Sequence, residues 1–381
     1  MQLGIDLFLK GIKKYKYKKL AILTNHSSTS KNLIPTFKII SEKLNLKFIL
    51  APEHGLFGTK QMEEKIEDEY FNNIPVISLY GEKGPFIPEN IFDEFDILII
   101  DIPDTGSRYY TYKWTMMMCI EKCSKYKKEV IILDRPNPLN GIDIEGPILD
   151  KNFKSFVGYY PIPVRFALTP AELAIYLNEK FKIGCEIKVY KMEGWKRKYY
   201  SDDLNLKWIP PSPNIPDFET CLLYAGMCLF EGTNISEGRG TTRPFKIFGA
   251  DFIEPFKIEK HFKNLKEIIL KPTYFKPLWS KYKGKICGGF EIYIKNRKKF
   301  KPFKTGVEII KILKNVYPEK FEWKNPPYEF EKDKMPFDLL AGNSYIREMI
   351  EKNFDYKEIE EKWKKDLEEY KEEIKDFFLY N

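Results

Sequence analysis

Short apolar segments recur through the first third of the chain, and a cluster of polar residues follows each one. The segments occupy residues 20–24, 48–50, 76–80, 97–101 and 130–134, with helix-length stretches between them. Continuous apolar strands with helical connections are typical of a parallel sheet that is covered on both faces. The pattern therefore predicts an α/β domain with a doubly wound parallel sheet. In such sheets, ligands bind where the strands end.

The polar clusters at these strand ends supply the first candidate site residues. Thr24-Asn25-His26 follows the first strand, and Glu53-His54-Gly55 follows the second. Parallel strands present their carboxyl ends at one edge of the sheet, so these clusters are expected to meet there. Glu53 and His54 lie between a proline and two glycines, and glycine lets a substrate approach the backbone closely. We expect both residues to act as general acid or base; a role in capping a helix is the alternative.

Residues 101–112 combine acidic, guanidinium and aromatic side chains at another strand end. The candidates are Asp104, Arg108, Tyr109 and Tyr112. Aromatic rings stack on the faces of sugars, while charged groups hold hydroxyl and carboxylate groups. This combination is typical of a site for a polyol or a sugar acid. The alternative is a helix start with Asp104 as its cap and the tyrosines in the core.

Around residues 145–165 the regular alternation of apolar strands and helix-length segments ends, and glycine and proline occur repeatedly. A segment rich in glycine and proline indicates a domain boundary. We therefore expect a first domain over residues 1–155 and a second over residues 156–381. In the proline-rich loop at 208–216, Asn214 is a candidate sugar contact, and a rigid connector is the alternative.

The densest polar stretch of the second half is rich in glycine and spans residues 231–243. Its candidate site residues are Glu231, Asn234, Glu237, Arg239 and Arg243. Because arginine binds planar anionic groups well, Arg239 and Arg243 are expected to hold an anion. Glu237 is a candidate for a second carboxylate at the site. A surface loop is the alternative.

Several other chemistries lack their sequence motifs. The first strand is not followed by G-x-G-x-x-G, and neither a P-loop nor a G-x-S-x-G motif occurs. The six cysteines form no C-x-x-C pair and there are only three histidines, which disfavours a zinc site and a disulfide framework. We therefore expect carboxylate chemistry without a cofactor or a metal ion.

Charge and hydropathy disfavour two classes of partner. The net charge of +8 comes from 63 basic and 55 acidic residues that are interspersed, so no basic stripe indicates a nucleic-acid site. No apolar run approaches membrane-spanning length. The first residues show no export signal, so we expect a cytoplasmic protein; an exported protein whose true start lies upstream is the alternative. The sequence leaves the oligomeric state open.

Six motifs, in order along nearly the whole chain, resemble those of the NamZ (YbbC-like) exo-β-N-acetylmuramidases. They are Leu23-Thr24-Asn25, Pro52 to Gly55, Asp101 to Tyr112, Leu133 to Pro138, Pro211 to Asn214 and Glu231 to Phe245. The resemblance implies a Rossmann-like N-terminal domain and a smaller C-terminal α/β domain, with the active site in the cleft between them.

The resemblance also implies an activity. Family members remove β-1,4-linked N-acetylmuramic acid (MurNAc) from the non-reducing ends of peptidoglycan fragments, so a saccharide such as MurNAc-GlcNAc is the expected substrate. Glu53 matches the favoured catalytic residue, which we expect to be the general acid, and His54, Asp104, Arg108 and Tyr112 match the tract around it. Glu237, Arg239 and Arg243 would be the contribution of the C-terminal domain.

Two questions stay open at this point. Asp104 and Glu237 are rival candidates for the second carboxylate, and the acetamido group of the substrate is a third possibility. Arg108, Arg239 and Arg243 are all candidates for binding the lactyl carboxylate. A non-catalytic protein that binds cell-wall sugars, and an amidase or esterase of muropeptides, are the alternative functions.

Overall fold

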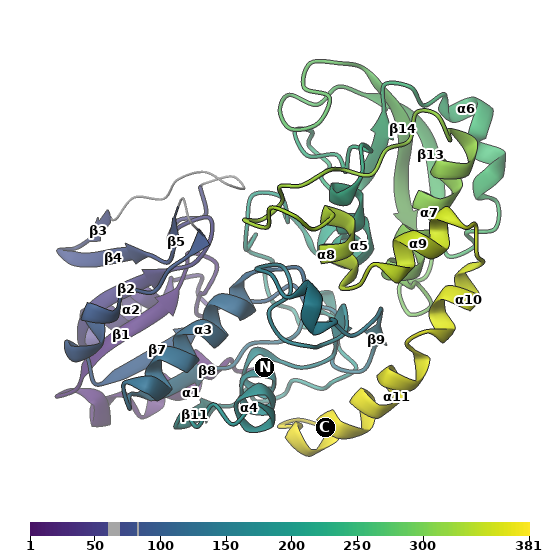
Figure 1. Cartoon of the computed structure of the whole chain (residues 1–381). Helices are drawn as coiled ribbons and strands as arrows, with labels where there is room; N and C mark the ends of the chain where they lie inside the picture. Colours follow the sequence, from purple (N-terminus) through teal and green to yellow (C-terminus); the bar gives the residue numbers. More distant parts are fainter. Residues whose placement is uncertain (60–68, 82–83) are drawn as a thin grey trace.

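The computed structural model describes residues 1–59, 69–81 and 84–381, and the chain forms two α/β regions (Figure 1). The first region is built on a seven-stranded sheet with the order β11-β8-β7-β1-β2-β4-β3. Its strands are β1 (Lys19–Thr24), β2 (Asn45–Ala51), β3 (Glu69–Phe71), β4 (Ile74–Ser78), β7 (Ile97–Asp101), β8 (Glu129–Leu133) and β11 (Ile187–Tyr190). Neighbouring strands pair in parallel, except that β3 runs antiparallel to β4 at one edge. The five predicted strands and the parallel sheet are thus confirmed.

Helices cover both faces of this sheet. They are α1 (Gly4–Lys10), α2 (Thr36–Lys43), α3 (Tyr112–Lys125) and α4 (Pro170–Lys180). Successive side chains of a strand point to opposite faces. On β1, Leu20 and Ile22 therefore join the core that α1 and α2 cover, whereas Ala21 and Leu23 join the core that α3 and α4 cover. Burial on both faces explains why the strands read as continuous apolar runs.

Short elements connect the main ones. They are β5 (Tyr80–Gly81), β6 (Gly84–Pro85), β9 (Ile144–Glu145), β10 (Arg165–Phe166), and the 3₁₀ helices η1 (Ile12–Tyr15), η2 (Glu89–Asp93), η3 (Lys151–Phe153) and η4 (Ser201–Asp203). Both β5–β6 and β9–β10 are antiparallel pairs.

The second region contains a three-stranded antiparallel sheet of order β12-β14-β13. Its strands are β12 (Ile247–Ala250), β13 (Ile268–Phe275) and β14 (Cys287–Ile294). Its helices are α5 (Phe218–Met227), η5 (Cys228–Gly232), α6 (Pro255–Ile258), η6 (Glu259–Phe262), α7 (Pro302–Val316), α8 (Pro336–Ala341), α9 (Tyr345–Glu351), α10 (Tyr356–Glu361), α11 (Lys364–Glu373) and η7 (Ile374–Phe377). One buried cluster runs through both regions, from Leu98 of β7 to Phe230 of η5 and Ile309 of α7. This shared core fixes the two regions against each other.

The boundary between the regions lies further along the chain than the expected division at residues 155 and 156. Strand β11 pairs with β8 and so belongs to the first sheet, and α4 packs on the same sheet. The glycine- and proline-rich stretch at 145–165 instead connects β9 to β10, which pair with each other. The second region begins near α5, after the proline-rich loop.

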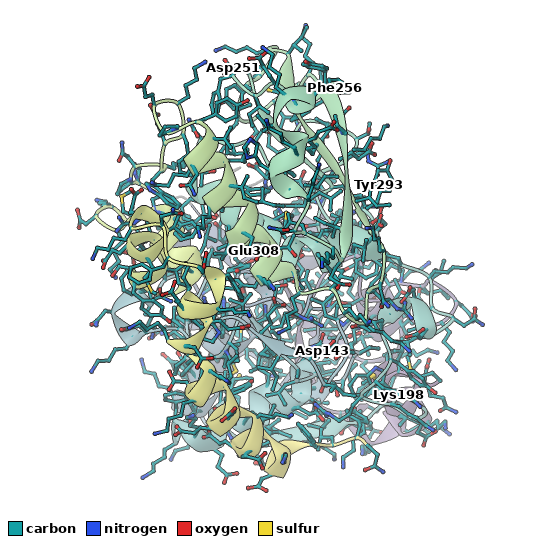
Figure 2. All side chains as sticks on the ribbon, turned by 90° about the vertical axis from the view of Figure 1, so that its right-hand side faces the viewer. Asp143, Lys198, Asp251, Phe256, Tyr293 and Glu308 are labelled. Atoms are coloured by element: carbon teal, nitrogen blue, oxygen red, sulfur yellow. The ribbon has the colours of Figure 1, made fainter. Side chains whose placement is uncertain are left out.

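The C-terminal segment returns to the first region. In Figures 1 and 2, α10 and α11 run from the second region back toward the first. At the end of the chain, the Tyr380 hydroxyl donates a hydrogen bond to Asp134 (2.6 Å), and the Leu379 amide donates one to Glu172 (2.8 Å). The tail therefore ties the second region to the strand and helix that carry these two carboxylates.

The surface agrees with the interspersed charges of the sequence. Charged groups of both signs are spread over the face in Figure 2, and many pair locally, as Lys365 does with Glu369 at 3.5 Å. The six cysteines are free and buried. None of the described helices is long and apolar enough to cross a membrane.

Candidate active site

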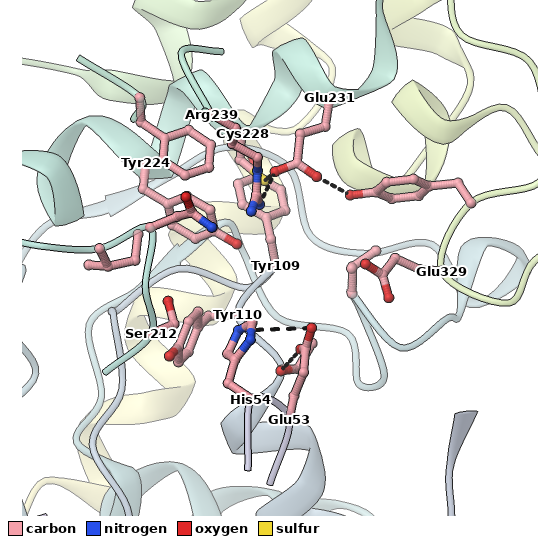
Figure 3. Close-up of a pocket in the computed structure, with 16 residues that line it drawn as sticks. Glu53, His54, Tyr109, Tyr110, Ser212, Tyr224, Cys228, Glu231, Arg239 and Glu329 are labelled. Carbon is pink, nitrogen blue, oxygen red and sulfur yellow. Dashed lines mark hydrogen bonds and ion pairs between the residues drawn. The ribbon is translucent and has the colours of Figure 1, made fainter. Parts of the chain in front are cut away.

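A pocket lies where the carboxyl edge of the first sheet meets the second region (Figure 3). Glu53 and His54 face it from the first region, and Glu231, Arg239 and Glu329 face it from the second. The lining residues are Glu53, His54, Tyr109, Tyr110, Thr111, Val157, Ser212, Asn214, Ile215, Tyr224, Cys228, Glu231, Arg239, Phe245, Tyr328 and Glu329. The site thus lies at the sheet edge that the strand pattern indicated.

Glu53 occupies a fixed position at the end of β2. Its side chain is only 6% exposed, and its Oε2 accepts a hydrogen bond from the Thr111 hydroxyl (2.6 Å). Thr111 directly precedes α3, so this bond joins the end of β2 to the start of α3. The other carboxyl oxygen, Oε1, lies 3.9 Å from Nε2 of His54. One oxygen of Glu53 is therefore anchored and the other is next to an imidazole.

His54 has a left-handed backbone, with φ of +70°. Residues other than glycine adopt this conformation rarely, and such strain concentrates at functional sites. Gly55 follows with φ of +76°, which glycine tolerates without strain. The two consecutive left-handed residues turn the chain sharply and place both side chains of the Glu53-His54 pair in the pocket.

Tyr109 contributes an unusual polar group. It is 1% exposed and lines the pocket, and its hydroxyl has no hydrogen-bond partner among the described residues. Burial raises the pKa of Tyr109 well above the ordinary value, so the hydroxyl keeps its proton. Burying a hydroxyl group without a hydrogen-bond partner destabilises the folded protein. A ligand that carries hydroxyl groups would supply the missing partner when it binds in the pocket.

The proline-rich loop contributes the wall between the two regions. The carbonyl of Pro211 accepts hydrogen bonds from the Tyr112 hydroxyl (2.7 Å) and from the Asn25 amide (3.3 Å). These bonds hold the loop against the first sheet, and its next residues, Ser212 and Asn214, line the pocket. The loop is therefore both a rigid connector and part of the site.

On the opposite side, Arg239 lies between two carboxylates. Its Nη2 is 2.7 Å from Oε1 of Glu231, and its Nε is 3.5 Å from Oε1 of Glu237. The second oxygen of Glu231 accepts a hydrogen bond from the Tyr328 hydroxyl (2.8 Å). Burial alone would raise the pKa of Glu231, but the Arg239 guanidinium and these hydrogen bonds lower it. Glu231 is therefore ionised, and its charge is compensated.

Glu329 is a third carboxylate of the pocket, and sequence reasoning missed it. It is 5% exposed, and its Oε2 accepts a hydrogen bond from the Tyr80 hydroxyl of β5 (3.1 Å). The loop that carries it, between α7 and α8, has no periodicity and no motif that marks it. Tyr224, Tyr328 and Thr111 were missed as well. Only a three-dimensional contact with Glu53 or Glu231 distinguishes them from other hydroxyl residues.

The two carboxylates proposed from sequence as partners of Glu53 lie outside this pocket. Asp104 forms an ion pair with Lys113 (3.0 Å) and accepts a hydrogen bond from the Gly106 amide, beside a separate depression. Glu237 forms an ion pair with Lys281 (3.0 Å) and lines a different cavity of the second region. Neither one is among the residues that line the pocket of Glu53.

The three candidate arginines have three different environments. Arg108 is fully buried and donates hydrogen bonds to the carbonyls of Pro147, Ile162, Leu340 and Ala341. Arg243 forms an ion pair with Glu291 at 2.7 Å and does not line the pocket. Arg239 alone among the three lines the pocket. Arg108 thus fastens the two regions together by backbone contacts.

Three further predicted residues do not line the pocket: Asn25 and Tyr112 lie behind it, and Asn234 lines the separate cavity of the second region. The Asn25 side chain bonds Tyr112 (2.9 Å) and the proline-rich loop, and both residues are fully buried. Asn234 bonds the backbone of Lys320 and Glu322 in the second region. Tyr109 and Asn214, in contrast, line the pocket. Among the residues that the structure describes, no group of three His, Cys, Asp or Glu side chains is placed to hold a metal ion.

Comparison with known proteins covers the whole chain. Residues 20–219 match the family described as Exo-beta-N-acetylmuramidase NamZ, N-terminal, and residues 222–380 match its C-terminal counterpart. The peptidoglycan beta-N-acetylmuramidase NamZ of Bacillus subtilis (strain 168) is 38% identical over 387 aligned residues, which cover 100% of this chain and 91% of that protein.

Two crystal structures are also similar over the full length. Both are DUF1343 family proteins from Bacteroides fragilis NCTC 9343. One has a TM-score of 0.88 at 29% identity, and the other a TM-score of 0.76 at 30% identity. In each case the similarity covers 100% of this chain and 99% of the other.

Proposed function

The chain belongs to the NamZ family of exo-β-N-acetylmuramidases, and we propose that it releases MurNAc from saccharides such as MurNAc-GlcNAc, with Glu53 as the general acid. Membership in this family means that the chain is a glycosidase and that the substrate of the chain derives from peptidoglycan. What carries the assignment to Glu53 is its position: it is a buried carboxyl group at the carboxyl edge of the sheet, inside the pocket between the two regions.

In this proposal, Glu53 protonates the glycosidic oxygen as the bond to the anomeric carbon breaks. Leaving groups that are poor, such as a sugar hydroxyl, need this proton. The Thr111 bond to Oε2 supports the assignment because it fixes the orientation of the carboxyl group. Oε1, on the side of His54, is then the oxygen that carries the proton to the substrate.

Arg239 is the residue that we assign to the lactyl carboxylate of MurNAc. It is the one of the three candidate arginines that lines the pocket. The lactyl group distinguishes MurNAc from N-acetylglucosamine (GlcNAc), and a site built for a charged group rejects ligands that lack it. Because Glu231 already pairs with Arg239, the carboxylate of the substrate would join this pair as a further acceptor of the guanidinium.

The test is Glu53→Gln, assayed on MurNAc-GlcNAc and on a nitrophenyl β-glycoside of MurNAc. Glutamine keeps the shape but cannot give up a proton. We expect kcat on the disaccharide to fall by about a thousandfold. The loss on the nitrophenyl glycoside should be much smaller, because that leaving group departs without protonation. Glu94→Gln, at an exposed site of the same region, is the matched control.

Wild-type turnover of the disaccharide by Glu53→Gln would exclude Glu53 as the acid. Mass spectrometry of the products separates the alternative functions. Free MurNAc indicates a glycosidase, released peptide an amidase and released lactate an esterase. Saturable binding of MurNAc without any product would indicate a binding protein.

A further inference from the structure

The pocket of Glu53 is lined by further carboxylates. Three carboxylates line the pocket among the described residues: Glu53, Glu231 and Glu329. Asp104 and Glu237 point elsewhere and pair with lysines. The partner of Glu53, if a protein side chain supplies it, is therefore Glu231 or Glu329.

The contacts of Glu231 commit it to another task. Its Oε1 binds Arg239 and its Oε2 binds Tyr328, so both oxygens are occupied and the adjacent cation neutralises the charge. Glu231 is well placed to hold Arg239 in position, and its removal would leave a buried guanidinium without compensation.

Glu329 lies at the tip of a tight turn that reaches into the pocket. The backbones of Tyr328 and Glu331 exchange two hydrogen bonds, each of 2.9 Å. The two residues between them, Glu329 and Phe330, have φ of +45° and +69°. Positive φ at both central residues is the pattern of type I′ turns, which favour asparagine and glycine.

This turn is therefore occupied by residues that strain it. A left-handed conformation is unfavourable for a residue with a β-carbon. The same kind of strain occurs at His54, beside Glu53. The strained turn places the carboxylate of Glu329, in the second region, within hydrogen-bond distance of the Tyr80 hydroxyl in the first region. Strain at Glu329 and at His54, the neighbour of Glu53, points to function rather than to folding.

We propose, on the basis of the function proposed above, that Glu329 is the second catalytic carboxylate. While Glu53 protonates the leaving oxygen, Glu329 stabilises the positive charge that develops at the anomeric carbon as the glycosidic bond breaks. Glycosidases divide the work in this way between two carboxyl groups held in different environments. Tyr80 is then a positioning residue, because its hydroxyl fixes one oxygen of Glu329.

The decisive variants are Glu329→Gln and Glu329→Gly, with Glu331→Gln as the control from the same turn. Glu329→Gln should lower kcat by about a hundredfold or more on both MurNAc-GlcNAc and the nitrophenyl glycoside. The positive charge develops with either leaving group, so a better leaving group should not restore the rate. This differs from Glu53→Gln, which the nitrophenyl group should largely rescue. Glu331→Gln should keep the wild-type rate.

Glu329→Gly separates catalysis from folding. Glycine removes the carboxylate but relieves the left-handed strain. The midpoint of urea denaturation should therefore stay close to that of the wild type, while the variant is as inactive as Glu329→Gln. A residue with only a structural role would show the opposite: lost stability and retained turnover of the folded protein.

Two results would overturn the assignment. One is a wild-type kcat in Glu329→Gln; the other is a loss restricted to the disaccharide, which would place Glu329 at the leaving group. In both cases the wild-type protein would still release free MurNAc, so the proposed function would stand. If the wild-type protein released none, the proposed function itself would fail.

Discussion

The two walls of the pocket are built in different ways. On the first wall, Glu53 follows β2 of a regular sheet, and Thr111 directly precedes α3. A hydrogen bond between them fixes one oxygen of the carboxyl group. On the second wall, Glu231 lies in the short helix η5, while Arg239 and Glu329 lie in loops. Glu231 pairs with Arg239, and Glu329 accepts a hydrogen bond from the first region. A sheet edge positions a functional group through the backbone, whereas loops need a network of side chains.

Arg108 joins the two regions that carry these walls. Of the substitutions that we propose, its replacement should have the largest effect on the protein. It donates to two carbonyls of the first region and to Leu340 and Ala341 at the end of α8, where helix carbonyls lack partners of their own. Gly342 is also adapted to it, since a β-carbon there would lie 2.6 Å from the guanidinium. Arg108→Met should reduce the free energy of unfolding by about 4 kcal/mol, measured by urea denaturation.

The contrast between the two walls would be wrong if Arg108 bound the substrate and did not stabilise the fold. Arg108→Met would then keep its stability and show a raised KM for MurNAc-GlcNAc. The control is Arg243→Met, which removes a half-exposed ion pair with Glu291 and should change the free energy of unfolding by less than about 1 kcal/mol.

The difference between the walls also sets what the sequence could reveal. The strand pattern located the sheet edge, and with it Glu53 and His54, because apolar runs report burial and parallel strands end together. Arg108 was chosen for its chemical type, but burial and four carbonyl acceptors give it a structural role that no spacing indicates. Glu329 was missed because its role depends on the fold of one short turn and on Tyr80, which lies 249 residues away in the chain.

The long C-terminal helix shows the same limit. Apolar side chains recur every three or four residues from 359 to 377, which predicts one long helix with a buried side. Four of them are buried: Ile359, Trp363, Tyr370 and Ile374. The helix itself is divided, because α10 ends at Glu361 and α11 begins at Lys364. Periodicity reports which side of a segment faces the core, but it does not report where a helix bends to follow the surface it covers.

Arg239→Lys tests whether the side-chain network of the second wall binds the lactyl carboxylate. Lysine keeps the positive charge but loses the planar fork that reaches Glu231 and Glu237 together. We expect KM for MurNAc-GlcNAc to rise by about thirtyfold, and discrimination against the corresponding GlcNAc substrate to fall by a similar factor. Arg243→Lys, outside the pocket, is the control. An unchanged KM in Arg239→Lys would mean that another group binds the lactyl carboxylate.

Thr111→Val tests the first wall and should have the smallest effect. Valine has nearly the same shape as threonine and removes only the hydroxyl that donates to Glu53. The carboxyl group stays in place by virtue of the strand end but gains rotational freedom, so we expect kcat on MurNAc-GlcNAc to fall by about tenfold with an unchanged KM. Thr115→Val, one turn further along α3, should leave kcat unaltered. A loss as large as that of Glu53→Gln would show that the sheet edge does not position Glu53 without help, and that the first wall depends on side-chain pairing as much as the second.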